Sequence, residues 1–293
     1  MVGLALLAGL AAGCADSPTG DVPGKVDVVA TTDVWGSIAA AVGGPRVSVI
    51  SVINDPDQDP HSYEASSRTL LAVKEADLLI ENGGGYDDFM GRMISTAGND
   101  APVLDAVMVS GLTAPTGGEL NEHIWYDFAA VTRVAEAIAT KLGGLDPDHA
   151  SEFAANAKTF VAGVDRLTKA ERQLGAAHEG AGIAITEPVP LYMLEAMHVH
   201  NLTPAEFSAA VEEGRDVSPR VLADTLALFS EHRVELLVYN AQTSGPVTEQ
   251  VKAAAVSAGI PVVPVSETLP PGTTYLAWMA HNVARVREAL SQR

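Results

Sequence analysis

The chain has 293 residues, which is enough for two domains or one large one. Hydrophobic residues make up 47% of the chain and charged residues 19%, a composition that excludes a disordered protein because it can bury a large core. The formal net charge of −19 at pH 7 argues against binding to nucleic acid, which requires Lys and Arg side chains on the phosphates. This charge fits a protein that attracts cations, or one with a merely well-solvated acidic surface.

Residues 1–25 have the pattern of a targeting segment followed by a tether. An apolar run over residues 2–10 is too short to span a bilayer, and small residues lead from it to the single cysteine, Cys14. This order resembles a bacterial lipoprotein signal, which implies cleavage before Cys14 and lipid on its thiol. No Lys or Arg precedes the run, so a longer gene product could begin upstream. The alternative is a buried structural cysteine; one cysteine allows no intrachain disulfide.

Strands and helices alternate over residues 26–145, which predicts an N-terminal α/β lobe with a parallel sheet. The expected strands are 26–32, 47–53, 78–80 and one beginning at 103–104. Asp33 is expected to cap a helix that ends near Val42, and Asp127 a helix that ends at Gly143-Gly144. Between them we expect a helix over 67–76 and a loop over 112–122.

A long amphipathic helix is predicted between the two halves of the chain, within residues 146–180. Apolar residues recur at helical spacing from 148 to 178, and between Ala150 and Leu174 only Gly163 interrupts the pattern. We expect one helix of about 30 residues, well above the usual ~11–12. A helical hairpin is the alternative.

The alternation of strands and helices resumes over residues 181–293 and predicts a C-terminal α/β lobe. The expected strands are 182–186, 236–239 and 260–265. The expected helices are 191–197, 218–231, 246–258 and 275–290. The chain is therefore expected to be an α/β protein with two lobes, each with a parallel sheet, joined by one long linking helix.

Four side chains of metal-binding type lie in loops or at strand ends. His61 and His123 lie in loops of the first half, and Glu187 and Glu267 follow apolar strands of the second. Open parallel sheets place ligand sites at the carboxyl ends of their strands, and a carboxylate at a buried edge is costly unless it is paired or binds a cation. Taken singly, each histidine could be a hydrogen-bonded structural residue, and Glu187 a carboxylate at a helix N-terminus.

Two motifs carry a resemblance to a known family. They are Asp59-Pro60-His61-Ser62-Tyr63-Glu64 and Glu122-His123-Ile124-Trp125-Tyr126-Asp127, set in a two-lobe plan with a long linking helix. Over residues 26–293 the chain resembles the cluster A-I metal-binding proteins, which are the zinc and manganese receptors of bacterial ABC uptake systems.

The resemblance implies four metal ligands, two from each lobe: His61, His123, Glu187 and Glu267. Glu187 matches the third ligand because it stands five residues before Tyr192. Glu267 matches the fourth, although the family usually has the shorter Asp there. Asp127, besides capping a helix, would be a partner that orients an imidazole.

A site of two histidines and two glutamates suits Zn²⁺ in tetrahedral geometry, and suits Mn²⁺ if a carboxylate binds through both oxygens. Zn²⁺ should bind more tightly, but the sequence leaves the physiological metal open. His198 and His200 are a competing pair, since residues i and i+2 of a strand share a face; we expect them in an exposed region. Asp77, Asp87 and Asp88 are expected to be ordinary loop and surface carboxylates.

The resemblance implies a receptor rather than an enzyme. It would be a monomer on the outer side of the cell membrane, held by a lipid anchor, and it would pass Zn²⁺ or Mn²⁺ to an ABC permease. One alternative is a metal-dependent hydrolase, which needs an open coordination position and a base, but the chain has no His-Glu-x-x-His or Gly-x-Ser-x-Gly motif. The other is a siderophore or haem receptor on a similar frame.

Overall fold

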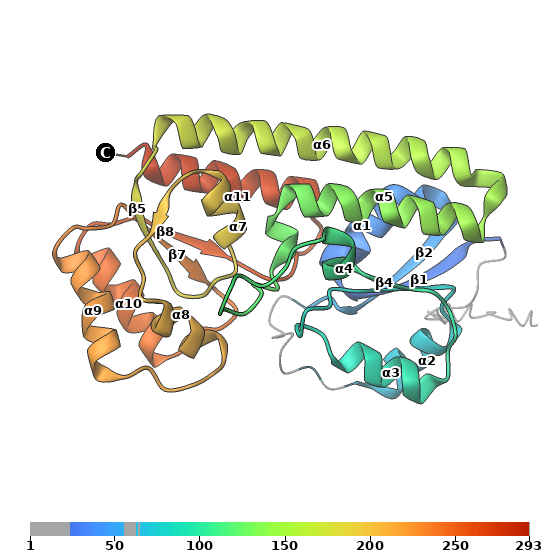
Figure 1. Ribbon diagram of the computed structural model, residues 1–293, viewed down its shortest axis with the longest axis horizontal. Helices are drawn as coiled ribbons and strands as arrows, with labels where there is room; N and C mark the ends of the chain where they lie inside the picture. The colour runs from blue at the N-terminus through green and yellow to red at the C-terminus, as the bar shows by residue number, and fades with distance from the viewer. Residues whose placement is uncertain (1–23, 56–62, 64, 293) are drawn as a thin grey trace, which may run out of the picture.

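In the computed structural model, residues 24–55, 63 and 65–292 are described. They form two lobes side by side under one long helix (Figure 1). Each lobe has a four-stranded, all-parallel sheet, with strand orders β2-β1-β3-β4 and β6-β5-β7-β8. The expected α/β fold with two parallel sheets and a long linking helix is therefore confirmed. Cys14 and His61 lie outside the described residues.

The N-terminal lobe alternates strands and helices as far as a pair of long helices. Its strands are β1 (Val26–Thr32), β2 (Val47–Ile53), β3 (Leu78–Glu81) and β4 (Val103–Asp105). Its helices are α1 (Asp33–Gly43), α2 (Ser67–Glu75), α3 (Phe89–Ala97), α4 (Ala106–Ser110) and α5 (Phe128–Leu145). Helix α6 (Ala150–Ala177) then runs for 28 residues without a break, so the helical-hairpin alternative is wrong.

The C-terminal lobe repeats the same strand order. Its strands are β5 (Gly182–Ile185), β6 (His200–Asn201), β7 (Leu236–Asn240) and β8 (Val262–Val265). Its helices are α7 (Leu191–Ala196), α8 (Ala205–Glu212), α9 (Pro219–Ser230), α10 (Pro246–Ser257) and α11 (Tyr275–Leu290). In each lobe the second strand pairs with one side of the first strand, and the third strand pairs with its other side. The connection to the second strand and the connection to the third strand therefore lead to opposite sides of the first strand. A ligand site is expected at the carboxyl ends beside such a switch point.

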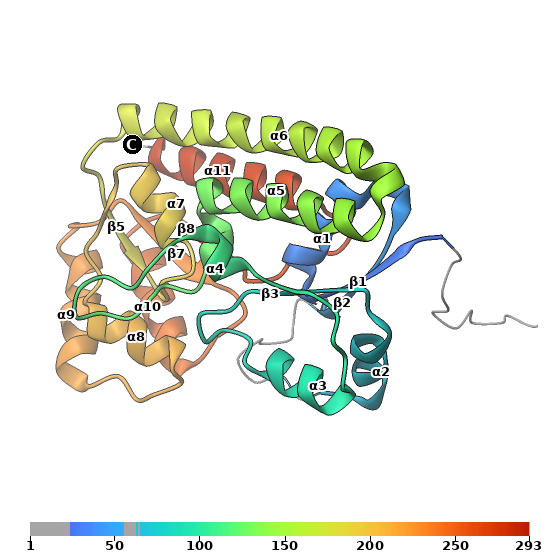
Figure 2. The ribbon, with the colours of Figure 1, turned by 45° about the vertical axis from the view of Figure 1, so that its right-hand side comes forward.

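Each sheet is buried on both faces because its strands are apolar on both sides. In β1, Val28 packs in a core that extends through both lobes, whereas Val29 packs in a separate cluster against α2 and α3. In β7, Val238 joins the shared core and Leu237 packs on α9 and α10. Helices α1, α5, α6 and α11 form the layer on the shared core, and α11 lies under α6 in both views (Figures 1 and 2).

Several local expectations are corrected by the structure. Thr32, not Asp33, holds the N-cap position of α1, and the Asp33 carboxylate instead accepts the Leu269 backbone N–H of the other lobe at 3.0 Å. Helix α5 continues through Gly143-Gly144 to Leu145. Helices α3, α4 and α8 and the short strand β6 were not predicted, because their apolar patterns are brief.

Asp87 is not a surface carboxylate. It is 2% exposed and accepts the backbone N–H groups of Asn82, at 2.6 Å, and Gly83, at 2.8 Å. It therefore holds the glycine-rich turn after β3 in place. Asp77 and Asp88 are exposed as expected, although Asp77 also accepts the Asp27 backbone N–H at 2.9 Å.

Among the described residues, no helix is both long enough and apolar enough to cross a lipid bilayer.

Helix α6 carries a buried carboxyl group. Glu171 is 3% exposed, and its Oε1 has no hydrogen-bond partner in the part of the chain that the structure describes. The pKa of Glu171 is raised to about 9, chiefly by burial; the nearby Asp127 carboxylate contributes to the rise and Arg172 opposes it. The native protein therefore holds Glu171 as a neutral acid at pH values where the unfolded chain has released that proton.

We expect Glu171→Gln to flatten the dependence of stability on pH. With a pKa raised by folding, Glu171 makes the free energy of unfolding fall as pH rises from about 5 to 9, by up to ~1.4 kcal/mol per pH unit. Urea unfolding of the metal-free protein at several pH values would measure this slope. Substitution of the exposed Glu179 by Gln is the control. Identical slopes for Glu171→Gln and the unmodified protein would show that Glu171 is not the source of the pH dependence.

Candidate metal centre

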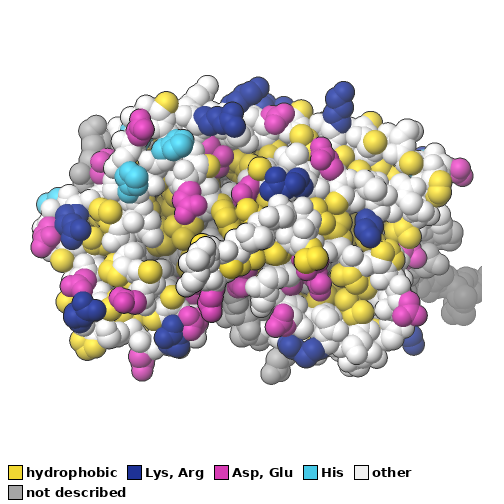
Figure 3. Space-filling model, in the orientation of Figure 1, with side chains coloured by type: hydrophobic (Ala, Val, Ile, Leu, Met, Phe, Trp, Pro, Cys, Tyr) yellow, Lys and Arg dark blue, Asp and Glu magenta, His cyan; other side chains and the backbone are white. Residues whose placement is uncertain are grey.

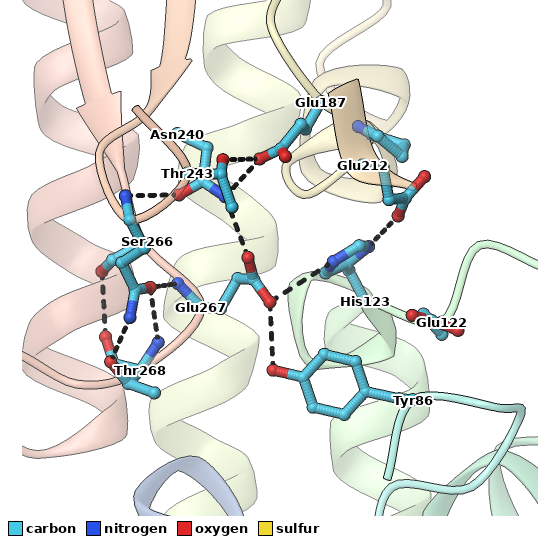
Figure 4. Close-up of polar contacts among 12 residues, drawn as sticks. Tyr86, Glu122, His123, Glu187, Glu212, Asn240, Thr243, Ser266, Glu267 and Thr268 are labelled. Atoms are coloured by element: carbon cyan, nitrogen blue, oxygen red, sulfur yellow. Dashed lines mark hydrogen bonds and ion pairs between the residues drawn. The ribbon is translucent and has the colours of Figure 1, made fainter. Parts of the chain in front are cut away.

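The carboxyl ends of three strands in the C-terminal lobe bring two carboxylates and an amide together. Glu187 lies just after β5, Asn240 ends β7 and Glu267 follows β8, and each is no more than 2% exposed. The Asn240 Nδ2 amide donates to Glu267 Oε1 at 2.9 Å and also to Glu187 Oε2 (Figure 4). One neutral amide therefore joins two buried carboxylates that would otherwise repel each other.

Glu187 is held through one of its two oxygens. Its Oε2 accepts hydrogen bonds from Asn240 Nδ2 and from the Thr243 hydroxyl. Burial raises the pKa of Glu187; the hydrogen bonds from Thr243 and Asn240 oppose the rise, and Glu267 adds to it. The carboxylate is thus oriented and desolvated, and a bound cation would favour its charged form.

His123 comes from the N-terminal lobe and faces this pair. It is fully buried just before a 3₁₀ turn, Ile124–Tyr126, and its Nε2 lies 3.8 Å from Glu267 Oε2. Its Nδ1 lies 2.8 Å from Asn121 Oδ1, while the Asn121 amide donates to the Pro188 carbonyl at 3.0 Å. Asn121 therefore presents an acceptor to Nδ1, which places a proton there and directs Nε2 toward the carboxylates, as in histidines that bind metals.

The ionisation of His123 is set by opposing effects. Burial alone would lower its pKa, but the carboxylates of Glu267, Glu212 and Glu122 outweigh burial and raise it. The charged imidazole also carries a proton on Nε2. A cation that binds Nε2 has to displace that proton, so binding should weaken as the pH falls.

Tyr86 is a second residue of the N-terminal lobe that reaches Glu267. It lies after β3, in the turn that Asp87 holds, and its hydroxyl donates to Glu267 Oε2 at 3.1 Å. The Tyr86 ring lies 5.0 Å from the ring of Trp125 and 5.9 Å from that of His123, edge to face with the imidazole. Burial raises the pKa of Tyr86 well above its usual value, so the phenol remains a hydrogen-bond donor.

Glu212, at the end of α8, lies at the edge of the site. Its Oε1 is 3.7 Å from His123 Nδ1, and its side chain keeps 23% exposure. Burial raises the pKa of Glu212 to about 7, and His123 opposes the rise. Acidic side chains also gather on the surface where the lobes meet, in the lower middle of Figure 3, so the surroundings of the site attract cations.

Three of the four expected ligands therefore converge from two lobes: His123, Glu187 and Glu267. Within the described residues, no group of three or more His, Cys, Asp or Glu side chains is already arranged to hold a metal ion. His61 lies outside those residues, so its place in the site stays a prediction. Its neighbour Tyr63 packs on Phe89, with ring centres 4.6 Å apart.

The remaining candidates have other surroundings. Asp127 caps α5 by accepting the Ala130 backbone N–H at 2.8 Å, and it is Asn121 that meets the imidazole of His123. His198 and His200 are both exposed, and His198 has a positive φ of 53°. Surface histidines are visible over the C-terminal lobe in Figure 3.

The sequence interpretation missed Tyr86, Asn121, Asn240 and Thr243. Asn240 could have been found, since it ends an apolar strand as Glu187 and Glu267 nearly do. Tyr86 and Asn121 lie in loops, where no periodicity indicates which way a side chain points. Thr243 is close to Glu187 only because two strand ends lie side by side.

Two parallel-sheet lobes, with polar side chains from both converging at the strand ends, define a two-lobed binding protein of the solute-receptor class. Comparison with known families specifies it further. The family model described as zinc-uptake complex component A, periplasmic, matches residues 28–289, and the chain belongs to that family. The resemblance to the cluster A-I metal-binding proteins is therefore confirmed.

Similar proteins carry different metals in their names. The manganese-binding lipoprotein MntA of Halalkalibacterium halodurans is 26% identical over 164 residues, which are 55% of this chain and 54% of that protein. The iron ABC transporter substrate-binding lipoprotein MtsA of Streptococcus pyogenes serotype M1 is 22% identical, over 92% of this chain and 90% of its own. The periplasmic zinc-binding protein TroA of Treponema pallidum has the same fold, with a TM-score of 0.74 at 19% identity over 91% of this chain and 99% of its own.

We expect Asn240→Leu to destabilise the metal-free protein more at high pH than at low pH. Without the Asn240 amide, the two buried carboxylates lose their shared hydrogen-bond donor, which lowers the free energy of unfolding by about 1–3 kcal/mol when they are charged. Protonation at low pH relieves their repulsion and so reduces this loss. Thermal unfolding at about pH 5 and about pH 8 would measure the difference. An equal loss at both values would mean that Asn240 matters for packing rather than for the carboxylates.

Proposed function

We propose that this protein is the extracytoplasmic receptor of an ABC uptake system for a divalent transition metal, Zn²⁺ or Mn²⁺. The metal is bound between the lobes by His61, His123, Glu187 and Glu267. The observation that carries the proposal is the 3.8 Å separation of His123 Nε2 and Glu267 Oε2. Two ligand atoms on one tetrahedral zinc ion lie about 3.4 Å apart, given bond lengths near 2.1 Å, so a small movement would let both bind one ion.

The chemistry of the site favours reversible binding over catalysis. Four protein ligands fill a tetrahedral shell, whereas a catalytic zinc keeps one position for water or substrate. The side chains that converge are buried carboxylates and an imidazole, which are ligands for a metal ion rather than the mostly apolar lining of a site for an organic molecule, and this disfavours a siderophore or haem receptor. Membership of a metal-uptake family supports the same conclusion.

The partners follow from this role. A lipid on Cys14 holds the protein at the outer face of the cell membrane, where it acts as a monomer and delivers its metal to an ABC permease. The acidic surface, with a net charge of −19, suits the collection of cations and not the binding of nucleic acid.

Removal of one ligand should weaken zinc binding strongly. We expect His61→Ala and His123→Ala each to raise the Kd for Zn²⁺ by at least about 30-fold, roughly 2 kcal/mol, because three ligands leave the ion partly hydrated. Calorimetric titration of the metal-free protein would measure the Kd, with His198→Ala as the matched control. If His61→Ala stays within about threefold of the unmodified protein, roughly 0.65 kcal/mol, the assignment of His61 fails.

The anchor can be tested separately from the metal. We expect the full chain, expressed in a bacterium that processes lipoproteins, to partition into detergent during phase separation, and Cys14→Ser to remain in the aqueous phase, because attached acyl chains supply the membrane affinity. Equal partitioning of both proteins would rule out lipid on Cys14 and would leave the metal site unaffected.

A further inference from the structure

The three converging ligands are shielded from solvent, whereas their neighbour Glu212 is not. His123, Glu187 and Glu267 are each no more than 2% exposed, but the Glu212 side chain keeps 23% exposure. An ion from solvent therefore has to pass other side chains before it reaches the ligands. The residues along its route would set how fast the ion binds and how fast it leaves.

A cavity of about 560 Å³ lies in the C-terminal lobe next to these ligands. One wall is residues 211–217, at the end of α8 and in the loop that follows, and the other is residues 242–248, between β7 and the first turn of α10. Several of the lining residues are exposed, among them Glu213, Asp216 and Ser244. The cavity is therefore open to solvent.

The inner end of the cavity reaches two of the ligands. The lining residue Thr243 donates its hydroxyl hydrogen to Glu187 Oε2, and the lining residue Glu212 places its Oε1 3.7 Å from His123 Nδ1. Figure 4 shows Thr243 and Glu212 beside these two ligands. The two walls of the cavity thus end at a ligand from each lobe.

The approach from the side of Glu267 is closed by hydrogen bonds. The Tyr86 hydroxyl donates to Glu267 Oε2 at 3.1 Å, and the Asn240 amide donates to Oε1 at 2.9 Å. Two residues further on, the Leu269 N–H donates to the Asp33 carboxylate of the other lobe at 3.0 Å. An ion that arrived here would have to break such bonds, whereas the cavity offers an approach that leaves them in place.

The charges that line the cavity suit a cation. Three acidic side chains and one basic side chain belong to its lining, namely Glu212, Glu213, Asp216 and Arg215. Arg215 Nη2 donates to Glu213 Oε1 at 2.8 Å, so the one positive charge is paired. The net negative charge of the walls raises the local concentration of cations in the cavity.

Given the metal site proposed above, we infer that this cavity is the passage through which the metal ion enters and leaves, and that Glu212 is the carboxylate that receives the ion at its inner end. A hydrated ion has to lose water before it can lie among buried ligands, and transfer of a bare charge is costly. The half-buried Glu212 replaces part of that water with a carboxylate oxygen, so dehydration proceeds in steps.

The passage can be tested by filling it. We expect Ser244→Trp to slow both the association and the release of Zn²⁺ by about fivefold or more, with the Kd unchanged within about twofold, because a blocked route affects both directions equally. Stopped-flow mixing with an excess of a fluorescent zinc chelator would measure release, and competition with the same chelator would measure association. Ser230→Trp, at an exposed serine at the end of α9, is the control.

The role of Glu212 is tested by a substitution of the same shape. We expect Glu212→Gln to slow association of Zn²⁺ by about fivefold, while Glu206→Gln, which removes the same charge from an exposed position of α8, stays within about twofold of the unmodified protein. Equal effects of the two substitutions would show that Glu212 contributes only general charge, which would overturn its assignment.

The route itself has a clear contrary result. If a folded Ser244→Trp protein bound and released Zn²⁺ within about twofold of the unmodified rates, the ion would use another approach and the inference would fail. This result leaves the proposed function intact. If the unmodified protein bound neither Zn²⁺ nor Mn²⁺, the proposed function would fail, and that outcome is seen before any variant is compared.

Discussion

Glu187 and Glu267 are buried carboxylates that share the side-chain amide of Asn240, and the site depends on this shared amide. Asn240 is held in turn: its backbone N–H donates to the Thr186 hydroxyl at 2.9 Å, and its Oδ1 accepts the Gln242 N–H at 3.1 Å. Burying two like charges is costly unless donors or a cation compensate them. The strand ends supply the hydrogen-bond donors, and a bound metal ion would supply the positive charge that compensates the two carboxylates further.

The N-terminal lobe completes the site through contacts that also hold the lobes together. The Tyr126 hydroxyl donates to the Ser266 carbonyl at 3.0 Å, next to Glu267, and the Tyr192 hydroxyl donates to the Asn121 carbonyl at 2.8 Å. Asn121 thus bonds the other lobe while it orients His123. Because the same residues orient the ligands and join the lobes, the approach of the lobes and the geometry of the site are coupled.

The sequence predicted the regular helices and strands of this protein well, because each of them follows from a local pattern of hydrophobic residues. Strands β1, β2, β5 and β7 and helices α6 and α11 lie close to their expected positions, since each is a continuous apolar run or a long helical period. The expectation that ligand sites lie at the carboxyl ends of parallel strands also selected Glu187 and Glu267, which the structure brings together. The family resemblance paired them with His123.

The parts that could not be predicted depend on contacts between distant segments. The sequence predicts Asp33 as a helix cap, but its carboxylate accepts the backbone N–H of Leu269, which is 236 residues away. The sequence predicts Asp87 as an exposed carboxylate, yet the glycine turn around it buries it. Tyr86 could not be linked to Glu267, because no local pattern relates a loop in one lobe to a strand end in the other. The boundaries chosen at residues 145 and 180 remain predictions.

The return of α11 to the N-terminal lobe has a consequence for folding. This last helix packs on α6 and α1, and Tyr275 at its start donates to the Trp125 carbonyl at 2.6 Å. The final segment of the chain therefore completes the core of the first lobe. Because one buried core extends through both lobes, we expect the two sheets to unfold in one cooperative transition. A nascent chain released before its last helix would expose apolar surface on both lobes at once.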